Sequence, residues 1–268
     1  MEKRKVMVKE GNLHGIQLSC YTKSNKSGEQ FIKDHGIAYI ISGELEAYDG
    51  QETHIYRSGE VVLFRKNTLI RFVKYPEKDG EFQAISVNLE ESFLQDFASH
   101  YGIHAQHPPK GSLFKMDRDP LITHYFTGLL AWFGQQVSPE LMDIKKSEII
   151  HLLLRHDEQL KDIMFHFAIP GKINLEAFMN KHFRFNTPLT QLAFLTGRSL
   201  ASFKRDFEKI FSTSPSRWLQ QKRLEEAYYL LNTKNWKPKD VYLEVGFETL
   251  SHFSYAFKNK FGVNPSNV

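Results

Sequence analysis

Cationic and hydroxyl residues recur in two matching segments near the C-terminus, residues 188–211 and 238–261. In each segment a second helix is predicted to begin at a hydroxyl residue, Ser199 or Thr249, and lysine or arginine residues lie between its apolar positions. Lysine, arginine and hydroxyl side chains donate hydrogen bonds to phosphate groups and to base edges. The chemistry that these segments can do is therefore nucleic-acid binding.

The apolar residues of the two segments indicate how such helices are positioned. Each segment carries three phenylalanines at i, i+4 and i+8, which a helix places in one row facing a core. The rows are Phe203, Phe207 and Phe211, and Phe253, Phe257 and Phe261. Both segments predict a short helix, a turn with a glycine (Gly197 or Gly246) and a second helix. This repeated pattern is typical of paired DNA-binding helix-turn-helix motifs.

The segment that joins the two motifs, residues 215–231, predicts a stiff helix. It opens with Pro215 after Ser214 and continues without glycine or another proline. A helix of this length spans about 25 Å. Two recognition helices held by such a connector can enter successive major grooves, about 34 Å apart on one face of a duplex.

The other reactive residues form no catalytic pattern. His100 and His104 flank Gly102, and His151 and His156 point to different faces of a helix. The sequence has no Gly-x-Ser-x-Gly, no phosphate-binding glycine-rich loop and no His-Glu-x-x-His. Its single cysteine, Cys20, excludes an intramolecular disulfide and fits a reducing cytosol.

Positive charge is concentrated in the repeat region. Residues 172–268 carry 15 Lys and Arg against 8 Asp and Glu, a net charge of +7, whereas the rest of the chain carries 20 against 23, a net charge of −3. This asymmetry is expected when one domain meets phosphate and the other does not. Because no apolar stretch resembles a signal peptide or a membrane span, we expect a cytoplasmic protein that binds no membrane.

The pattern predicts an α+β protein of two domains. Residues 13–88 contain short runs of β-branched and aromatic residues separated by Ser-Gly and Asp-Gly pairs, as in a β-barrel or sandwich. Helices are expected over about 90–168, followed by a linker at 168–172. We expect a regulatory and dimerisation domain at 1–170 and an all-α domain with two helix-turn-helix motifs at 172–268. The expected strands are 37–41, 45–48, 54–56, 61–64, 69–73 and 82–87, and the expected helices include 121–133 and 141–154.

Several motifs resemble the AraC/XylS family of bacterial transcription regulators. They are Gly-Arg-Ser-Leu at Gly197, Phe-Lys-Arg-Asp-Phe at Phe203, Gly-Phe at Gly246, Ser-His-Phe-Ser at Ser251, and Phe-Lys-Asn-Lys-Phe-Gly-Val-Asn-Pro at Phe257. The family signature covers about 174–265. The N-terminal part resembles the cupin-type regulatory domain of many members, and the whole chain is similar to the subgroup that contains type III secretion master regulators.

The resemblance implies a sequence-specific activator that forms a homodimer, binds double-stranded promoter DNA and contacts RNA polymerase. It also implies control through the N-terminal domain, and the sequence leaves open whether a small-molecule effector or a regulatory protein exerts it. Among the implied DNA contacts, Arg205 is expected to contact guanine, and Lys258 and Lys260 phosphate. The second segment, residues 238–261, lacks an arginine that is frequent in the family, so we expect this copy of the motif to discriminate bases less strongly. The implied contacts are Arg198, Ser199, Ala201, Ser202, Lys204, Arg205 and Lys209 in copy one, and Leu250, Ser251, Ser254, Tyr255 and Lys258 in copy two.

A cupin-type metal or small-molecule enzyme fused to a helical domain is the competing function. A cupin metal site needs converging histidines and a glutamate, but only His35 lies near the first position and residues 65–72 supply no histidine. We therefore expect no metal, no other cofactor and no catalytic residue. A third function, an architectural DNA binder, would not need the 171 residues that precede the repeat.

Two features of the N-terminal domain stay open at this level. A barrel lined by Tyr39, Ile41, Phe64 and Phe72, with His35 at its rim, could hold a small apolar ligand or be filled by these side chains. The apolar helices expected at 121–133 and 141–154 either pair with a second subunit or pack against the barrel.

Overall fold

The computed structural model of this protein describes residues 10–23 and 25–268. The chain divides into two compact units. The first runs to Gly28 and from Ile32 to Ala168, and the second comprises Ile169–Val268 with Glu29–Phe31. Along the described chain, none of the helices combines the length and the apolar character that crossing a bilayer requires.

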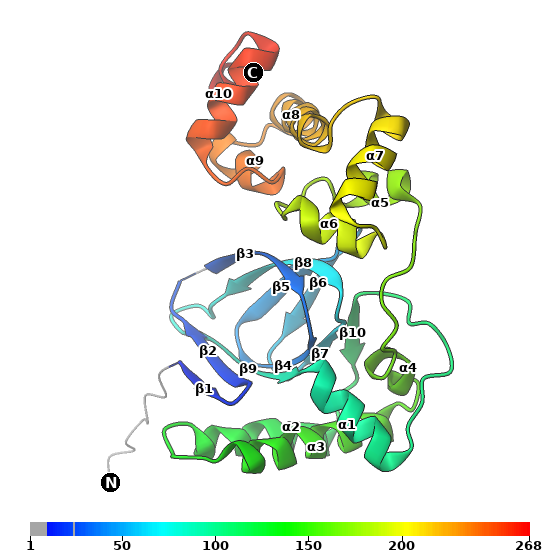
Figure 1. Cartoon of the computed structure of the whole chain (residues 1–268). Helices are drawn as coiled ribbons and strands as arrows, with labels where there is room; N and C mark the ends of the chain where they lie inside the picture. The colour runs from blue at the N-terminus through cyan, green and yellow to red at the C-terminus, as the bar shows by residue number, and fades with distance from the viewer. Residues whose placement is uncertain (1–9, 24) are drawn as a thin grey trace. The chain divides into compact units, whose positions relative to one another are not determined.

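The strands between Gly11 and Met116 form two sheets (Figure 1). The larger has the strand order β1-β2-β9-β4-β7-β10 and the smaller the order β3-β8-β5-β6. The strands are β1 (Gly11–Leu13), β2 (Ile16–Tyr21), β3 (Asn25–Ile32), β4 (His35–Ser42), β5 (Glu44–Tyr48), β6 (Thr53–Arg57), β7 (Val61–Phe64), β8 (Thr68–Tyr75), β9 (Phe82–Leu89) and β10 (Leu113–Met116).

Side chains of β4 alternate between two apolar clusters, because successive residues of a strand point to opposite faces. Ala38 and Ile40 join residues of both sheets, such as Ile70 and Phe82, in the core between the sheets. Ile37 and Tyr39 face the helices, and the ring of Tyr39 stacks on that of Phe126 at 5.3 Å between centroids. The sheet is therefore buried on both faces along this strand.

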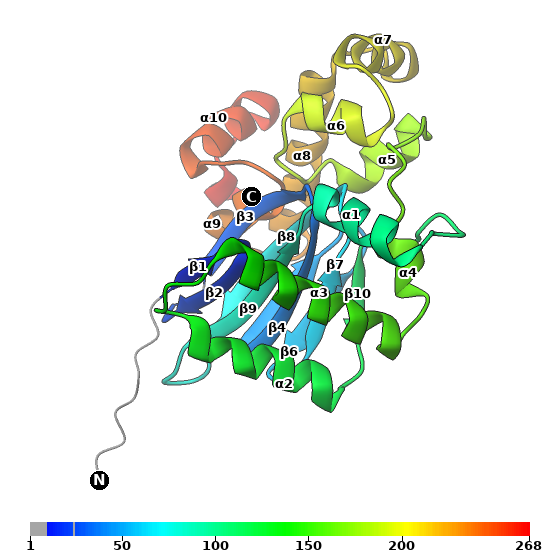
Figure 2. The ribbon, with the colours of Figure 1, turned by 60° about the horizontal axis from the view of Figure 1, so that its bottom comes forward.

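Helices cover the outer face of the larger sheet (Figure 2). They are α1 (Glu91–Tyr101), α2 (Pro120–Leu129), the 3-10 turn Leu130–Trp132, α3 (Pro139–His156) and α4 (Leu160–Met164). Several apolar side chains of α2 and α3, among them Ile122, Phe126, Ile149 and Leu153, are fully buried in this layer, whereas Leu121 and Ile144 are exposed. The packing of these two helices against the sheet thus accounts for much of their apolar character.

All regular elements of the second unit between Leu175 and Asn267 are helices. It consists of α5 (Leu175–His182), α6 (Leu189–Leu195), α7 (Leu200–Phe211), α8 (Pro215–Asn232), α9 (Pro238–Glu244), α10 (Leu250–Phe261) and the 3-10 turn Pro265–Asn267. The predicted α+β fold class, a sheet-rich N-terminal domain with helices and a C-terminal helical domain, is confirmed.

The two phenylalanine rows lie in the cores of the helix-turn-helix motifs, as predicted. Phe203 and Phe207 are fully buried, and Phe207 meets Trp218 of α8 edge to face at 5.7 Å. Phe253 and Phe257 are equally buried, and the ring of Phe257 stacks on Tyr228 of α8 at 6.2 Å. The last phenylalanine of each row is only half-buried. Helix α8 therefore forms one wall of both cores.

The strands differ from the expectation at both ends of the sheet-rich region. Strands β1, β2, β3 and β10 are absent from the expected set, and β10 lies within the stretch expected to be helical. Residues of β10 pair with β7, Leu113 opposite Phe64 and Met116 opposite Val61. A four-residue strand that forms only by pairing with a distant segment leaves almost no periodic pattern in the sequence.

Candidate nucleic-acid interface

The turn of the first motif rests on the backbone of the preceding linker. Gly197 adopts a left-handed conformation with φ of +65°. A Cβ atom built there would lie 2.4 Å from the carbonyl carbon and oxygen of Gly171 and 2.6 Å from the nitrogen of Lys172. Only glycine permits both this conformation and this approach. The turn and the linker therefore form one packed element.

Helix α7 begins at the predicted hydroxyl cap. The backbone N–H of Ser202 donates to Oγ of Ser199 at 3.2 Å, so this hydroxyl serves the helix end. Beyond the cap, Ala201, Lys204 and Arg205 are exposed, as is Lys209, and Ser202 is half-buried. The polar face expected to meet DNA is accordingly open to solvent.

The guanidinium of Arg205 is exposed on the surface of α7. Its side chain is 67% exposed, and its only ion-pair partner among the described residues is Asp206, at 3.9 Å between Nε and Oδ1. An exposed ion pair of this length is weak. The guanidinium is therefore available for bidentate hydrogen bonding.

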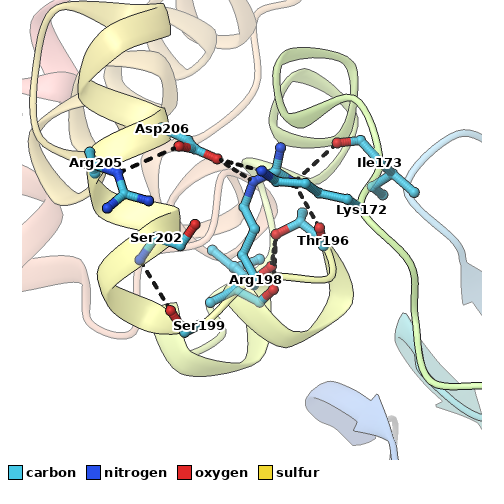
Figure 3. Close-up of polar contacts among 10 residues, drawn as sticks. Lys172, Ile173, Thr196, Arg198, Ser199, Ser202, Arg205 and Asp206 are labelled. Atoms are coloured by element: carbon cyan, nitrogen blue, oxygen red, sulfur yellow. Dashed lines mark hydrogen bonds and ion pairs between the residues drawn. The ribbon is translucent and has the colours of Figure 1, made fainter.

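Arg198 lies inside the domain, which differs from the expectation that it faces DNA (Figure 3). Its side chain is only 8% exposed. Nε donates to Oδ2 of Asp206 at 3.1 Å, and Nη1 donates to the carbonyl oxygens of Thr196 at 2.7 Å and of Ile173 at 3.1 Å. One guanidinium thus joins the end of α6, the start of α7 and the linker.

Asp206 completes this arrangement as the acceptor for several cations. Besides Arg198, Nζ of Lys172 lies 3.5 Å from its Oδ2. The hydrogen bond from Arg198, supported by the charge of Lys172, lowers the pKa of Asp206 below its ordinary value. The carboxylate is therefore charged at neutral pH, and it binds the linker to α7.

Helix α10 repeats the cap but exposes a different surface. The N–H of His252 donates to Oγ1 of Thr249 at 3.2 Å. The exposed face carries Leu250 (41% exposed) and Tyr255 (70% exposed). Ser251 and Lys258 are exposed and Ser254 is half-buried. This face is less cationic and more apolar than that of α7, so the two motifs offer different chemistry to a duplex.

Lys260, expected to meet phosphate, is held by the connector helix. Its Nζ donates to the carbonyl oxygen of Gln221 at 3.1 Å and to Oε1 of Glu225 at 2.9 Å. Both partners are on α8, far away in sequence, so the spacing of residues on α10 gave no indication of these bonds. The ammonium fastens α10 to α8.

The five residues expected to line a barrel pocket do not meet. Tyr39 and Ile41 belong to the helix-covered cluster, whereas Phe64 and Phe72 pack against the core between the sheets. His35 is 1% exposed, and its Nδ1 accepts from the N–H of Lys66 at 3.3 Å. Because β4 is buried on both faces, the apolar character of its residues does not indicate to which face each side chain points.

Burial, with the nearby charges of Lys66 and Arg65, lowers the pKa of His35 to about 3. The imidazole is therefore neutral at physiological pH. No group of three or more His, Cys, Asp or Glu side chains that could hold a metal ion occurs in residues 10–23 and 25–268.

The comparisons with known proteins agree with this arrangement. Residues 35–163 match the ExsA N-terminal regulatory domain, and residues 192–268 match a helix-turn-helix domain. The HTH-type transcriptional regulator ExsA of Pseudomonas aeruginosa is 24% identical over 255 residues, which cover 92% of this chain and 90% of the relative. The virulence regulon transcriptional activator VirF of Yersinia enterocolitica is 22% identical over 241 residues, which cover 87% of this chain and 88% of the relative.

Among solved structures, an apo form of ToxT from Vibrio cholerae is 16% identical, covers 97% of this chain and 98% of its own, and aligns with a TM-score of 0.49. The two matched domains and the relatives that span nearly the whole chain agree with the motifs of the repeat region. The chain therefore belongs to the AraC/XylS family of transcription regulators, with an ExsA-type N-terminal regulatory domain and a helix-turn-helix DNA-binding domain.

Proposed function

We propose that this protein is a transcription activator that recognises promoter DNA with α7 and α10. The observation that carries the proposal is the repetition of a capped helix with an open polar face, anchored by a buried phenylalanine row, on both sides of α8. The positive charge of residues 172–268 supports contact with phosphates. The relative VirF is a virulence regulon transcriptional activator, which supports activation rather than repression.

The two helices have different roles in this proposal. Arg205 contacts a guanine in the major groove, Lys204 lies on the same base-reading side, and Lys209 binds the phosphate backbone. Leu250 and Tyr255 of α10 contact thymine methyl groups, which gives weaker discrimination among bases. Arg198 contacts no base and instead holds α7 in position through Asp206 and the linker.

The first unit supplies control and assembly. The protein forms a homodimer, contacts RNA polymerase at the promoter and works in the cytoplasm, where the chromosome lies. The match of residues 35–163 to a regulatory domain supports control through this unit, exerted by a small molecule or by a protein partner. The proposal assigns no catalytic residue, because regulation of this kind requires binding alone.

Selection of genomic fragments with the purified protein at physiological salt, followed by footprinting, tests the proposal. We expect an enriched motif with two contact blocks about one helical turn apart. Binding that is independent of sequence and abolished by moderate salt would contradict it, because such binding reflects phosphate contacts alone. A preference for duplexes with a single contact block would contradict the role of one of the two helices.

A further inference from the structure

The connection between α5 and α6 lies against the turn of the second motif. Nδ2 of Asn186 donates to Oε1 of Glu248 at 2.8 Å, and Arg184 forms ion pairs with Glu226 of α8 and Glu244 of α9. Gly246 has φ of +90°, and a Cβ atom built there would lie 2.3 Å from the carbonyl oxygen of Arg184. The turn of the second motif thus packs on a backbone segment that precedes the first motif.

One guanidinium connects these segments. Arg223 of α8 donates from Nε to the carbonyl oxygen of Phe183 at 2.8 Å and from Nη2 to that of Phe185 at 2.7 Å. Its Nη1 donates to the carbonyl oxygen of Gly246 at 3.0 Å. The donors of a guanidinium are fixed in one plane, so three acceptors held together by it cannot move independently.

Apart from this contact and the neighbouring bonds of Arg184 and Asn186, the position of α10 relative to α7 depends on the packing of each motif against α8. The segment that leads from α8 to α9, residues 233–237, is exposed. Arg223 therefore adds a second connection between the first and second motifs, besides the helix α8 that joins them in the chain. Two connections resist rotation of one motif against the other. A single helix that is followed by an exposed segment does not resist such rotation.

We propose that Arg223 determines the spacing of the two contact blocks that the protein accepts on DNA. The inference rests on the proposed function. When two linked modules bind one duplex, the second binds at an effective concentration that is high only if the geometry of the link fits the separation of the sites. A rigid link therefore demands one spacing, whereas a looser link tolerates several and binds each less tightly.

The test measures affinity on three duplexes that carry the selected operator. The first has the natural spacing, the second has one base pair inserted between the blocks, and the third keeps only the block bound by α7. One inserted base pair moves the second block by about 3.4 Å and roughly 34°. The full-length protein is titrated against each labelled duplex, and fluorescence anisotropy gives the three Kd values.

Wild-type protein is expected to lose about tenfold or more in affinity on the second duplex, and about a hundredfold on the third. Arg223→Ala is expected to bind the natural spacing about tenfold more weakly, to lose less than about threefold on insertion, and to bind the single block as the wild type does. Arg217→Ala, which removes the same charge from an exposed position of α8, should keep the wild-type ratio between the first two duplexes.

Asn186→Ala removes an exposed contact of the same junction and tests the inference independently of any folding defect in Arg223→Ala. It is expected to reduce the insertion penalty by about threefold. A wild-type insertion penalty in Arg223→Ala and Asn186→Ala would overturn the inference, as would an equal loss on all three duplexes. If the wild type itself bound the first and third duplexes equally, the bipartite function would fail, whatever the variants did.

Discussion

Replacement of Gly197 by alanine combines the cost of a backbone conformation with that of a steric clash, and the same replacement at Gly262 carries the first cost alone. Alanine in the left-handed region costs about 1–2 kcal/mol. At Gly197 its Cβ would also lie 2.4 Å from the Gly171 carbonyl group, so the linker must move. Displacing packed atoms costs a further 1–3 kcal/mol or so. We therefore expect Gly197→Ala to destabilise the helical unit by about 2–5 kcal/mol.

Gly262→Ala is the matched control. Gly262 ends α10 with φ of +77°, and a Cβ atom there would have no neighbour within 4 Å. This variant should lose only about 1–2 kcal/mol. Urea unfolding is followed by tryptophan fluorescence in a Trp132→Phe background, so that emission comes from Trp218 and Trp236 of the helical unit. With an m-value of about 1–2 kcal/mol/M, the extra loss lowers the midpoint of Gly197→Ala below that of Gly262→Ala by about 0.5–3 M. Equal midpoints for the two variants would show that Gly197 does not rest on the linker in solution.

Three further predictions concern single side chains. Arg205→Ala should cost about 1–3 kcal/mol of operator binding and relax the preference at one base pair. Lys258→Ala should weaken binding to all sequences alike and lower the slope of log affinity against log salt concentration by roughly one. Titrations on specific and random DNA at several salt concentrations distinguish the two. Arg198→Ala should destabilise the helical unit by about 1.5–3 kcal/mol, because the charged hydrogen bonds to Asp206 and two carbonyl groups are lost; an unchanged urea midpoint would contradict its internal role. The lowered pKa of His35 means that the unfolded chain binds a proton more readily than the folded one, so stability is complete above pH 6.5 and declines toward pH 3. Between pH 7 and 5 the loss is about 2 kcal/mol for the first unit, and His35→Gln should reduce this slope in denaturation curves.

The helical unit could be predicted from the sequence in some detail, because its determinants are local. The spacing of Phe203 and Phe207 gives the buried face of α7, and a hydroxyl before the helix predicts its cap. Helix α8, at Pro215–Asn232, follows from a proline at its start and an uninterrupted run of helix-forming residues. Each of these features depends on residues within a few positions of one another.

The role of Arg198 could not be predicted in this way. Its carboxylate partner lies eight positions further on, and its carbonyl acceptors include Ile173, 25 residues earlier. An arginine beside a predicted recognition helix suggests a DNA contact unless the fold places an acceptor beside it. The same holds for Lys260, whose partners are on α8, and for Arg223, whose acceptors lie 38, 40 and 23 residues away.

For the sheet-rich unit, the fold class could be predicted from the sequence, but the residues of its predicted pocket could not. Six of its strands follow from apolar runs between turn residues, but their facing does not. Tyr39 and Phe64 are both aromatic residues in buried strands, and only the pairing of the strands shows that they lie in different clusters. A one-residue difference in register reverses every side chain of a strand, and a strand that is apolar on both faces gives no indication of its register.

The docking of Gly171 and Ile173 on the first motif affects how this protein can be recombined with others. The helix-turn-helix domain match begins at residue 192, whereas the backbone that supports Gly197 and accepts from Arg198 lies well upstream of it. A chimera that joined residues 174–268 to a foreign sensor would leave the first turn without its support. Domain exchange within the family should therefore succeed when the crossover precedes Gly171. The DNA-binding module that can be transferred as a unit includes residues that look in sequence like a spacer.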